Sequence, residues 1–165
     1  MAPSDPDEAA IIARSYWETL QGDVLATVEE YADAGYDASE LHPGMTSVLG
    51  SEYGDDHCGL GVLVLEDELQ DVDSLINSPG FEGADVYATK QGNIVLLAVF
   101  FKSEDPRRVL GFPTYYLPKQ AEEMLQEATE NGSIDIVLRT QFGDTLAIDC
   151  EDPSLFIPEE LDILD

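Results

Sequence analysis

The sequence has very little positive charge. Its 165 residues include 35 aspartates and glutamates but only 7 lysines and arginines, so the formal net charge is −28 at pH 7. Contacts to nucleic acid phosphates need lysine and arginine, and direct binding to DNA or RNA is therefore not expected. The acids occur along the whole chain and form no tail. An acidic decoy, which would gather its acids on one flank, is consequently the weakest of the alternatives.

Such a surface favours surroundings that screen charge strongly. In dilute buffer the carboxylates would repel one another and oppose compaction. At molar salt the screening length falls to roughly 3 Å, and most of this repulsion disappears. We therefore expect a salt-adapted cytoplasmic protein, with K⁺, Na⁺ or Mg²⁺ bound only loosely at its surface carboxylates.

Other features are also missing. No run of 18 apolar residues is present, so no membrane span is expected, and "MAPSDPDEAA" lacks the basic start of a signal peptide. Two cysteines, Cys58 and Cys150, do not make a disulfide framework, and both are expected as free thiols. The 44% hydrophobic content predicts a folded core. We expect one domain over 1–165, with loose ends at 1–6 and 158–165.

Periodicity predicts one long helix near the start of the chain. Asp5 is a good N-cap before Pro6. Apolar residues then recur every three or four positions, which predicts a helix over 6–34 that ends at Gly35 and places Trp17 in the core. Shorter helices are predicted at 67–77 and at Leu117–Asn131, the latter with Ala121, Met124, Leu125 and Ala128 inward.

Short apolar runs between turn residues predict the strands. They lie at 59–66, 84–90, 93–102, 107–113, 133–140 and 145–150, while 42–56 is expected to be irregular. The run at 93–102 is apolar on both faces, which indicates a central strand. The order of elements predicts an α+β fold: a mainly antiparallel sheet of about six strands, with the long N-terminal helix and a second helix packed on it.

Several segments carry a family resemblance. They are Trp17, "EEYADAGYDASELHPG" (29–44), the "GLGVLVL" strand, Val86-Tyr87, Pro113-Thr114-Tyr115-Tyr116, and Asp152-Pro153 with Phe156. With these motifs the chain resembles a family of uncharacterised haloarchaeal proteins, a domain of unknown function with no assigned activity. The resemblance implies a shared fold and salt adaptation, and it implies no catalytic residue.

The stretch "YGDDHCGLG" is the first candidate for chemistry. A zinc site would need His42, His57, Cys58 and Cys150, supported by Asp55 or Asp56. No two of these residues have a usual ligand spacing, and neighbouring residues of a strand point to opposite faces. Neither zinc nor a cysteine–histidine nucleophile is favoured, and we expect no cofactor. A small hydrolase or ligand-binding enzyme, with a pocket near His57 or His42, remains the alternative function.

The segment "LGFPTYYLP" (110–118) is the second candidate. Its rings Phe112, Tyr115 and Tyr116 pack in the core at a strand-to-helix junction or form a contact surface, since aromatic residues are enriched at interfaces. Arg107 and Arg108 are expected to bind an anion or a partner's carboxylate, or to pair with Glu104, Asp105 or other acids nearby. The leading hypothesis is a non-catalytic protein that binds an unknown protein partner or forms a homodimer.

Overall fold

The structure, a computed structural model, describes residues 6–51, 57–75, 81–104 and 107–158, with the backbone alone at 6–15, 74 and 75. The expected N-cap Asp5 lies outside the described residues. The elements are α1 (Pro6–Asp33), β1 (Asp37–Glu40), β2 (Thr46–Leu49), β3 (Gly59–Leu63), α2 (Glu66–Leu75), β4 (Gly83–Gln91), β5 (Ile94–Glu104), β6 (Arg107–Tyr116), α3 (Pro118–Asn131), β7 (Ile134–Arg139), β8 (Thr145–Cys150) and the 3-10 helix η2 (Pro153–Phe156).

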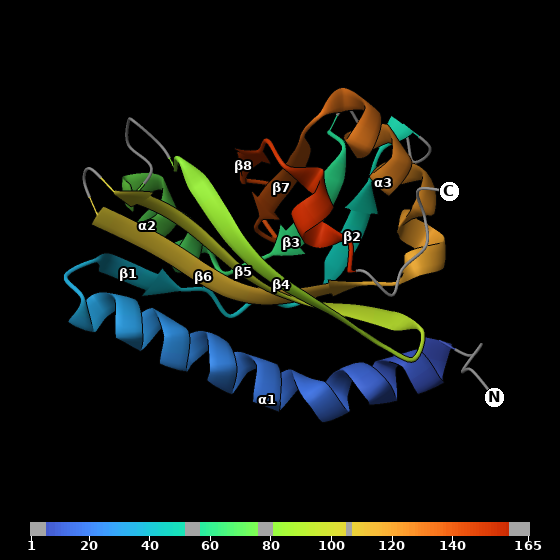
Figure 1. Ribbon diagram of the computed structural model, residues 1–165, viewed down its shortest axis with the longest axis horizontal. Helices are drawn as coiled ribbons and strands as arrows, with labels where there is room; N and C mark the ends of the chain where they lie inside the picture. The colour runs from blue at the N-terminus through green and yellow to red at the C-terminus, as the bar shows by residue number, and fades with distance from the viewer. Residues whose placement is uncertain (1–5, 52–56, 76–80, 105–106, 159–165) are drawn as a thin grey trace.

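The described strands form two four-stranded sheets. Sheet A has the order β1-β6-β5-β4 and sheet B has the order β2-β3-β7-β8. Each sheet contains one parallel pair, β1 with β6 and β3 with β7. Figure 1 shows α1 along one face of sheet A and sheet B with α3 on the other side. The predicted α+β class and long N-terminal helix are confirmed, although the strands divide into two sheets rather than one.

Strand β5 forms the centre of the molecule. Its residues 94–101 are all buried, which confirms the prediction of a central strand. Val95, Leu97, Val99 and Phe101 belong to the main core with sheet B, α2 and α3, whereas Ala98 and Phe100 pack under α1. Because neighbouring residues of a strand face opposite ways, β5 joins two hydrophobic layers. Full burial of one such side chain contributes roughly 1.5–3 kcal/mol.

The glycines predicted to end the first and third helices are confirmed, as is the inward face of α3, whereas the predicted end of the second helix at residue 77 lies outside the described residues. Gly35 follows α1 with φ 96°, and Gly132 caps α3 with φ 79°. The side chains predicted to face inward on α3 are all buried: Ala121, Met124, Leu125 and Ala128. Trp17 departs from the prediction, because it is only half-buried and lies edge-on to Tyr115, with ring centroids 5.9 Å apart.

Strands β1 and β2 depart from the sequence prediction. The segment 42–56 was expected to be irregular, yet β2 pairs with β3. Each strand has only four residues, too few for a clear sequence pattern, so pairing with a neighbouring strand decides their conformation. Strand β6 also continues past Pro113, where a strand was predicted to end. Strand β1 pairs only with residues 108–111, which leaves Pro113 without a partner strand on that side, where proline is tolerated.

Candidate functional site

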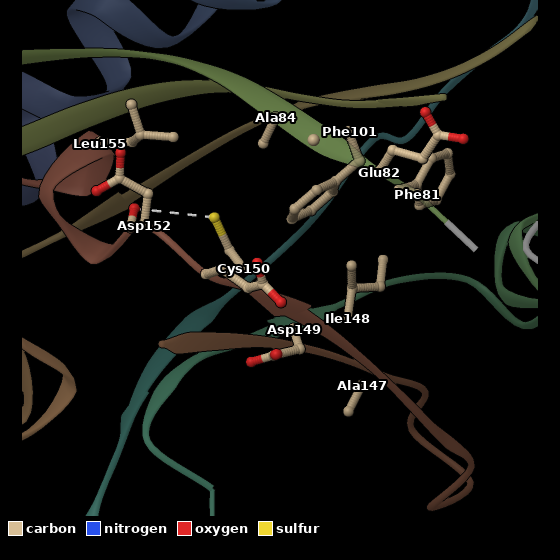
Figure 2. A pocket seen from close by; sticks show the side chains of 12 residues that line it. Phe81, Glu82, Ala84, Phe101, Ala147, Ile148, Asp149, Cys150, Asp152 and Leu155 are labelled. Carbon is tan, nitrogen blue, oxygen red and sulfur yellow. Dashed lines mark hydrogen bonds between the residues drawn. The ribbon is translucent and has the colours of Figure 1, made fainter. Parts of the chain in front are cut away.

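A cleft of about 860 Å³ opens between sheets A and B, where both sheets end in an edge strand (Figure 2). Its floor is apolar and its rim is acidic. Phe81, Ala84, Phe101, Ile148 and Leu155 form the floor; Glu82, Asp149, Glu151 and Asp152 lie at the rim; Gly83, Ala147 and Cys150 complete the lining. An apolar concavity with a few polar groups is the usual form of a binding site.

The residues of β8 that line the cleft show how the cleft lies relative to sheet B. Residues 147–152 are consecutive, and all of them line the cleft. Figure 2 shows Ile148 and Cys150 directed toward β4, whereas Ala147 and Asp149 point the other way. A cavity on one face of a strand would touch only every second residue. The cleft therefore runs along the edge of β8.

The charge at the rim has one sign. The described residues that line the cleft include four acids and no lysine, arginine or histidine. Asp149 also faces a second carboxylate, since Asp135 is its register partner on β7. Partial burial, and then the hydrogen bond and negative charge of Asp135, raise the pKa of Asp149. The arrangement favours a bound cation, which would relieve this repulsion.

The thiols at and near the cleft are not activated. The Cys150 sulfur lies 3.8 Å from the Asp152 carbonyl oxygen, and burial raises the pKa of this thiol. Burial, with a hydrogen bond to Glu127, raises the pKa of Cys58 to about 12. Only the thiolate is a good nucleophile. Covalent catalysis by either cysteine at neutral pH is therefore not supported.

We expect both thiols to resist alkylation in the folded protein. At pH 8 and molar KCl, iodoacetamide should modify Cys58 and Cys150 at least about tenfold more slowly than in urea, because the buried sulfurs stay protonated. Mass spectrometry of quenched samples measures the two rates separately. Rapid labelling of folded Cys150 would show that its sulfur is accessible from the cleft and ionised.

The structure does not bring the predicted zinc ligands together. His42 lies between two glutamates, with Nε2 2.5 Å from Glu40 and Nδ1 3.3 Å from Glu68. His57 Nδ1 is 3.4 Å from Asp135, and Cys58 donates to the Met124 carbonyl of α3. In the described part of the chain, no three histidine, cysteine or acidic side chains are arranged to hold a metal ion. Asp55 and Asp56 lie outside the described residues.

Neither histidine lines the cleft, which the enzyme alternative would require. The side chains of His42 and His57 are 63% and 45% exposed. They are also absent from a groove of about 400 Å³ between α1 and β4, and from one of about 210 Å³ between α2 and β8. Among the described residues, therefore, no histidine lines any of these three cavities.

The aromatic segment 110–118 lies mostly inside the protein. Phe112 is 0% exposed and Tyr116 is 2% exposed, and the Tyr116 hydroxyl donates to the Phe156 carbonyl at 2.7 Å. Phe112 and Tyr116 therefore pack in the core, and the Tyr116 hydroxyl is satisfied there. Of the three rings, only Tyr115 reaches the surface, where it contacts Trp17.

Arg107 holds the end of α1. Its guanidinium donates to the Ala34 carbonyl at 3.3 Å and lies 5.8 Å from the centre of the Tyr36 ring. A cation is favoured there, because the last carbonyls of a helix carry partial negative charge. Glu104, a predicted partner of Arg107, accepts the Tyr36 hydroxyl. Asp105, the other, lies outside the described residues, and Arg108 is half-buried on β6.

The fold and the cleft together define an α+β domain of two mixed sheets, with an acid-rimmed apolar cleft between their edges. The chain belongs to a family of unknown function, DUF7529, whose model matches residues 6–158. No curated protein and no solved structure matches it. Within the part that the structure describes, the helices are too short or too polar to cross a bilayer.

Proposed function

We propose that this protein is a non-catalytic binding domain, and that its cleft takes an apolar group carried by a positively charged partner. The cleft carries the proposal, because its lining combines an apolar floor with four acidic residues. Burial of apolar surface there stabilises a complex by roughly 25 cal/mol per Å². In molar salt the rim carboxylates attract only cations in near contact, because the salt screens electrostatic attraction over longer distances.

Two small probes of opposite charge test this proposal. Octyltrimethylammonium and octanoate share an alkyl chain, and only the cation should bind when each is titrated calorimetrically in 2 M KCl. Phe81→Ala removes part of the floor and should weaken binding of the cation several-fold. Phe142→Ala is the matched control, because Phe142 is 70% exposed and lies outside the cleft. Equal binding of both probes, or of neither, contradicts the proposal.

Asp149→Asn should separate binding from stability. The folded state holds the Asp149 pKa above its ordinary value, so this carboxyl favours folding less as the pH rises through that pKa. Removal of its charge should therefore raise the melting temperature at pH 7 and weaken octyltrimethylammonium binding. Thermal unfolding at pH 4 and pH 7 checks the sign, because the gain should shrink at pH 4. A loss of stability at pH 7 would contradict this account of the Asp135–Asp149 pair.

We infer further that the protein works in the salt-rich cytoplasm of a haloarchaeon. The net charge of −28 supports this inference, and both cysteines are free. A homodimer through the half-buried pair Trp17 and Tyr115 is a second proposal, because their rings meet at the protein surface. Sedimentation in molar KCl tests it: a monomer at all concentrations, unchanged by Tyr115→Ala, counts against this homodimer.

A further inference from the structure

We infer that the occupant of the cleft is an extended peptide with alternating basic and apolar residues, which adds to sheet B as a fifth strand along β8. This inference rests on the proposed function and specifies the partner. Strand addition gives affinity through main-chain hydrogen bonds and specificity through alternate side chains.

The edge of β8 has the hydrogen-bonding groups that strand addition needs. Among the described strands, β8 is the last of sheet B, and β7 is the one strand that pairs with it there. In an antiparallel pair, successive residues alternate between bonding to the partner and facing away from it. The Thr140 amide donates to the Asp144 carbonyl at 3.0 Å. Asp144 therefore bonds toward β7, and so do Leu146 and Ile148 at every second position. The backbone amides and carbonyls of Ala147 and Asp149, which alternate with them, face the open edge.

The side chains around this edge match an alternating peptide. On the inner face, an added strand would lie over Phe101 and Ile148, which favours an apolar residue. On the outer face, the carboxylate of Asp149 lies beside that of its register partner Asp135, and this proximity helps to raise the pKa of Asp149. A lysine or arginine placed beside Asp149 would form an opposite-charge cross-strand pair.

The length and charge of the edge argue against other occupants. The part of β8 that lines the cleft, 147–150, spans about 13 Å at the usual rise of a strand, which exceeds the reach of a small amine. A second copy of this chain is disfavoured at β8, because two such edges would bring Asp149 and Glu151 of both copies together. With 7 basic residues among 165, this chain also has no alternating basic segment of its own.

A proline substitution tests the strand addition. Ala147→Pro removes an amide that faces the open edge and should leave the β7–β8 bonds intact. The matched control is Thr145→Pro. The Thr145 amide also faces the open edge of β8, but Thr145 does not line the cleft. An acetylated seven-residue peptide of alternating lysine and valine is titrated in 1 M KCl, next to a peptide of the same composition with its lysines grouped.

We expect the alternating peptide to bind at least about tenfold more tightly than the grouped one. Ala147→Pro should lose about tenfold in affinity, and Thr145→Pro should stay within about twofold of the parent protein. Methylation of alternate peptide amides removes the same bonds from the ligand side, so it keeps the test valid if Ala147→Pro does not fold. Methylation in one of the two alternating frames should then abolish binding.

The two proposals fail in different ways. In the first case, octyltrimethylammonium binds, but the two peptides bind equally well, and neither Ala147→Pro nor methylation changes the affinity of the alternating peptide. Strand addition is then wrong, and the cleft keeps its proposed role. If neither the peptides nor octyltrimethylammonium bind, both proposals fall together.

Discussion

Dilution from 3 M to 0.01 M KCl should lower the melting temperature by more than about 20 °C and unfold much of the protein at 25 °C. The 35 carboxylates would then interact over a screening length of roughly 30 Å instead of less than about 3 Å. Two unit charges about 10 Å apart in water repel by about 0.4 kcal/mol. Summed over dozens of pairs, this repulsion is comparable to a typical stability of 5–15 kcal/mol.

Circular dichroism melts over a series of KCl concentrations measure this effect. At 0.01 M salt, a shift from pH 7 to pH 4.5 is the internal control, because protonation of carboxylates should restore part of the lost stability. The same melting temperature at 0.01 M and 3 M KCl would show that the acidic surface does not require salt, and the inferred salt-rich cytoplasm would lose its main support.

Gly59→Ala should be the most damaging substitution by a single methyl group. An added Cβ would overlap the Asp135 carbonyl oxygen, and it would lie 2.7 Å from the carbonyl carbon and 2.8 Å from the nitrogen of the same residue. Gly59 and Asp135 are register partners in the parallel pair of β3 and β7. Backbone atoms cannot rotate away, so this pairing must open. We expect a loss of about 3 kcal/mol or more in the free energy of unfolding.

Gly61→Ala is the matched control for this prediction. Gly61 lies on the same strand and pairs with the same partner, β7. Its added Cβ would meet the Arg139 guanidinium at 2.8 Å, and a long side chain can move aside. Urea unfolding in 2 M KCl should therefore show a loss of about 1 kcal/mol or less. Equal losses in the two variants would contradict the close approach of β3 and β7 at Gly59.

The regular elements could be predicted because their local signals are strong. Strand β5 is apolar on both faces, and α3 combines Pro118 and Gly132 at its ends with an apolar stripe between them. Strands β1 and β2 have four residues each, which is too short for a recognisable alternation. Tertiary pairing alone defines them, so the division of the strands into two sheets was not accessible from the sequence.

The candidate site was harder to predict than the fold. Residues 81–84 and 147–152 are distant in sequence, and they share a cleft only because β4 and β8 are the edge strands of different sheets. One part of the site did have a signal. The predicted strands 133–140 and 145–150 are joined by a tight turn at Gly143, which fixes their register and places Asp135 opposite Asp149. The hydrogen bond of Tyr116 was not accessible from the sequence, because its acceptor, the Phe156 carbonyl, belongs to η2.

The most direct test of the binding role is an amide chemical-shift map of the protein in 2 M KCl during titration with octyltrimethylammonium. The account predicts saturable shifts at 81–84 and 147–155, the two segments that enclose the cleft, and little change along the groove between α1 and β4. Shifts confined to that groove, or no saturable shifts at either place, would contradict the claim that the acid-rimmed cleft is the binding site.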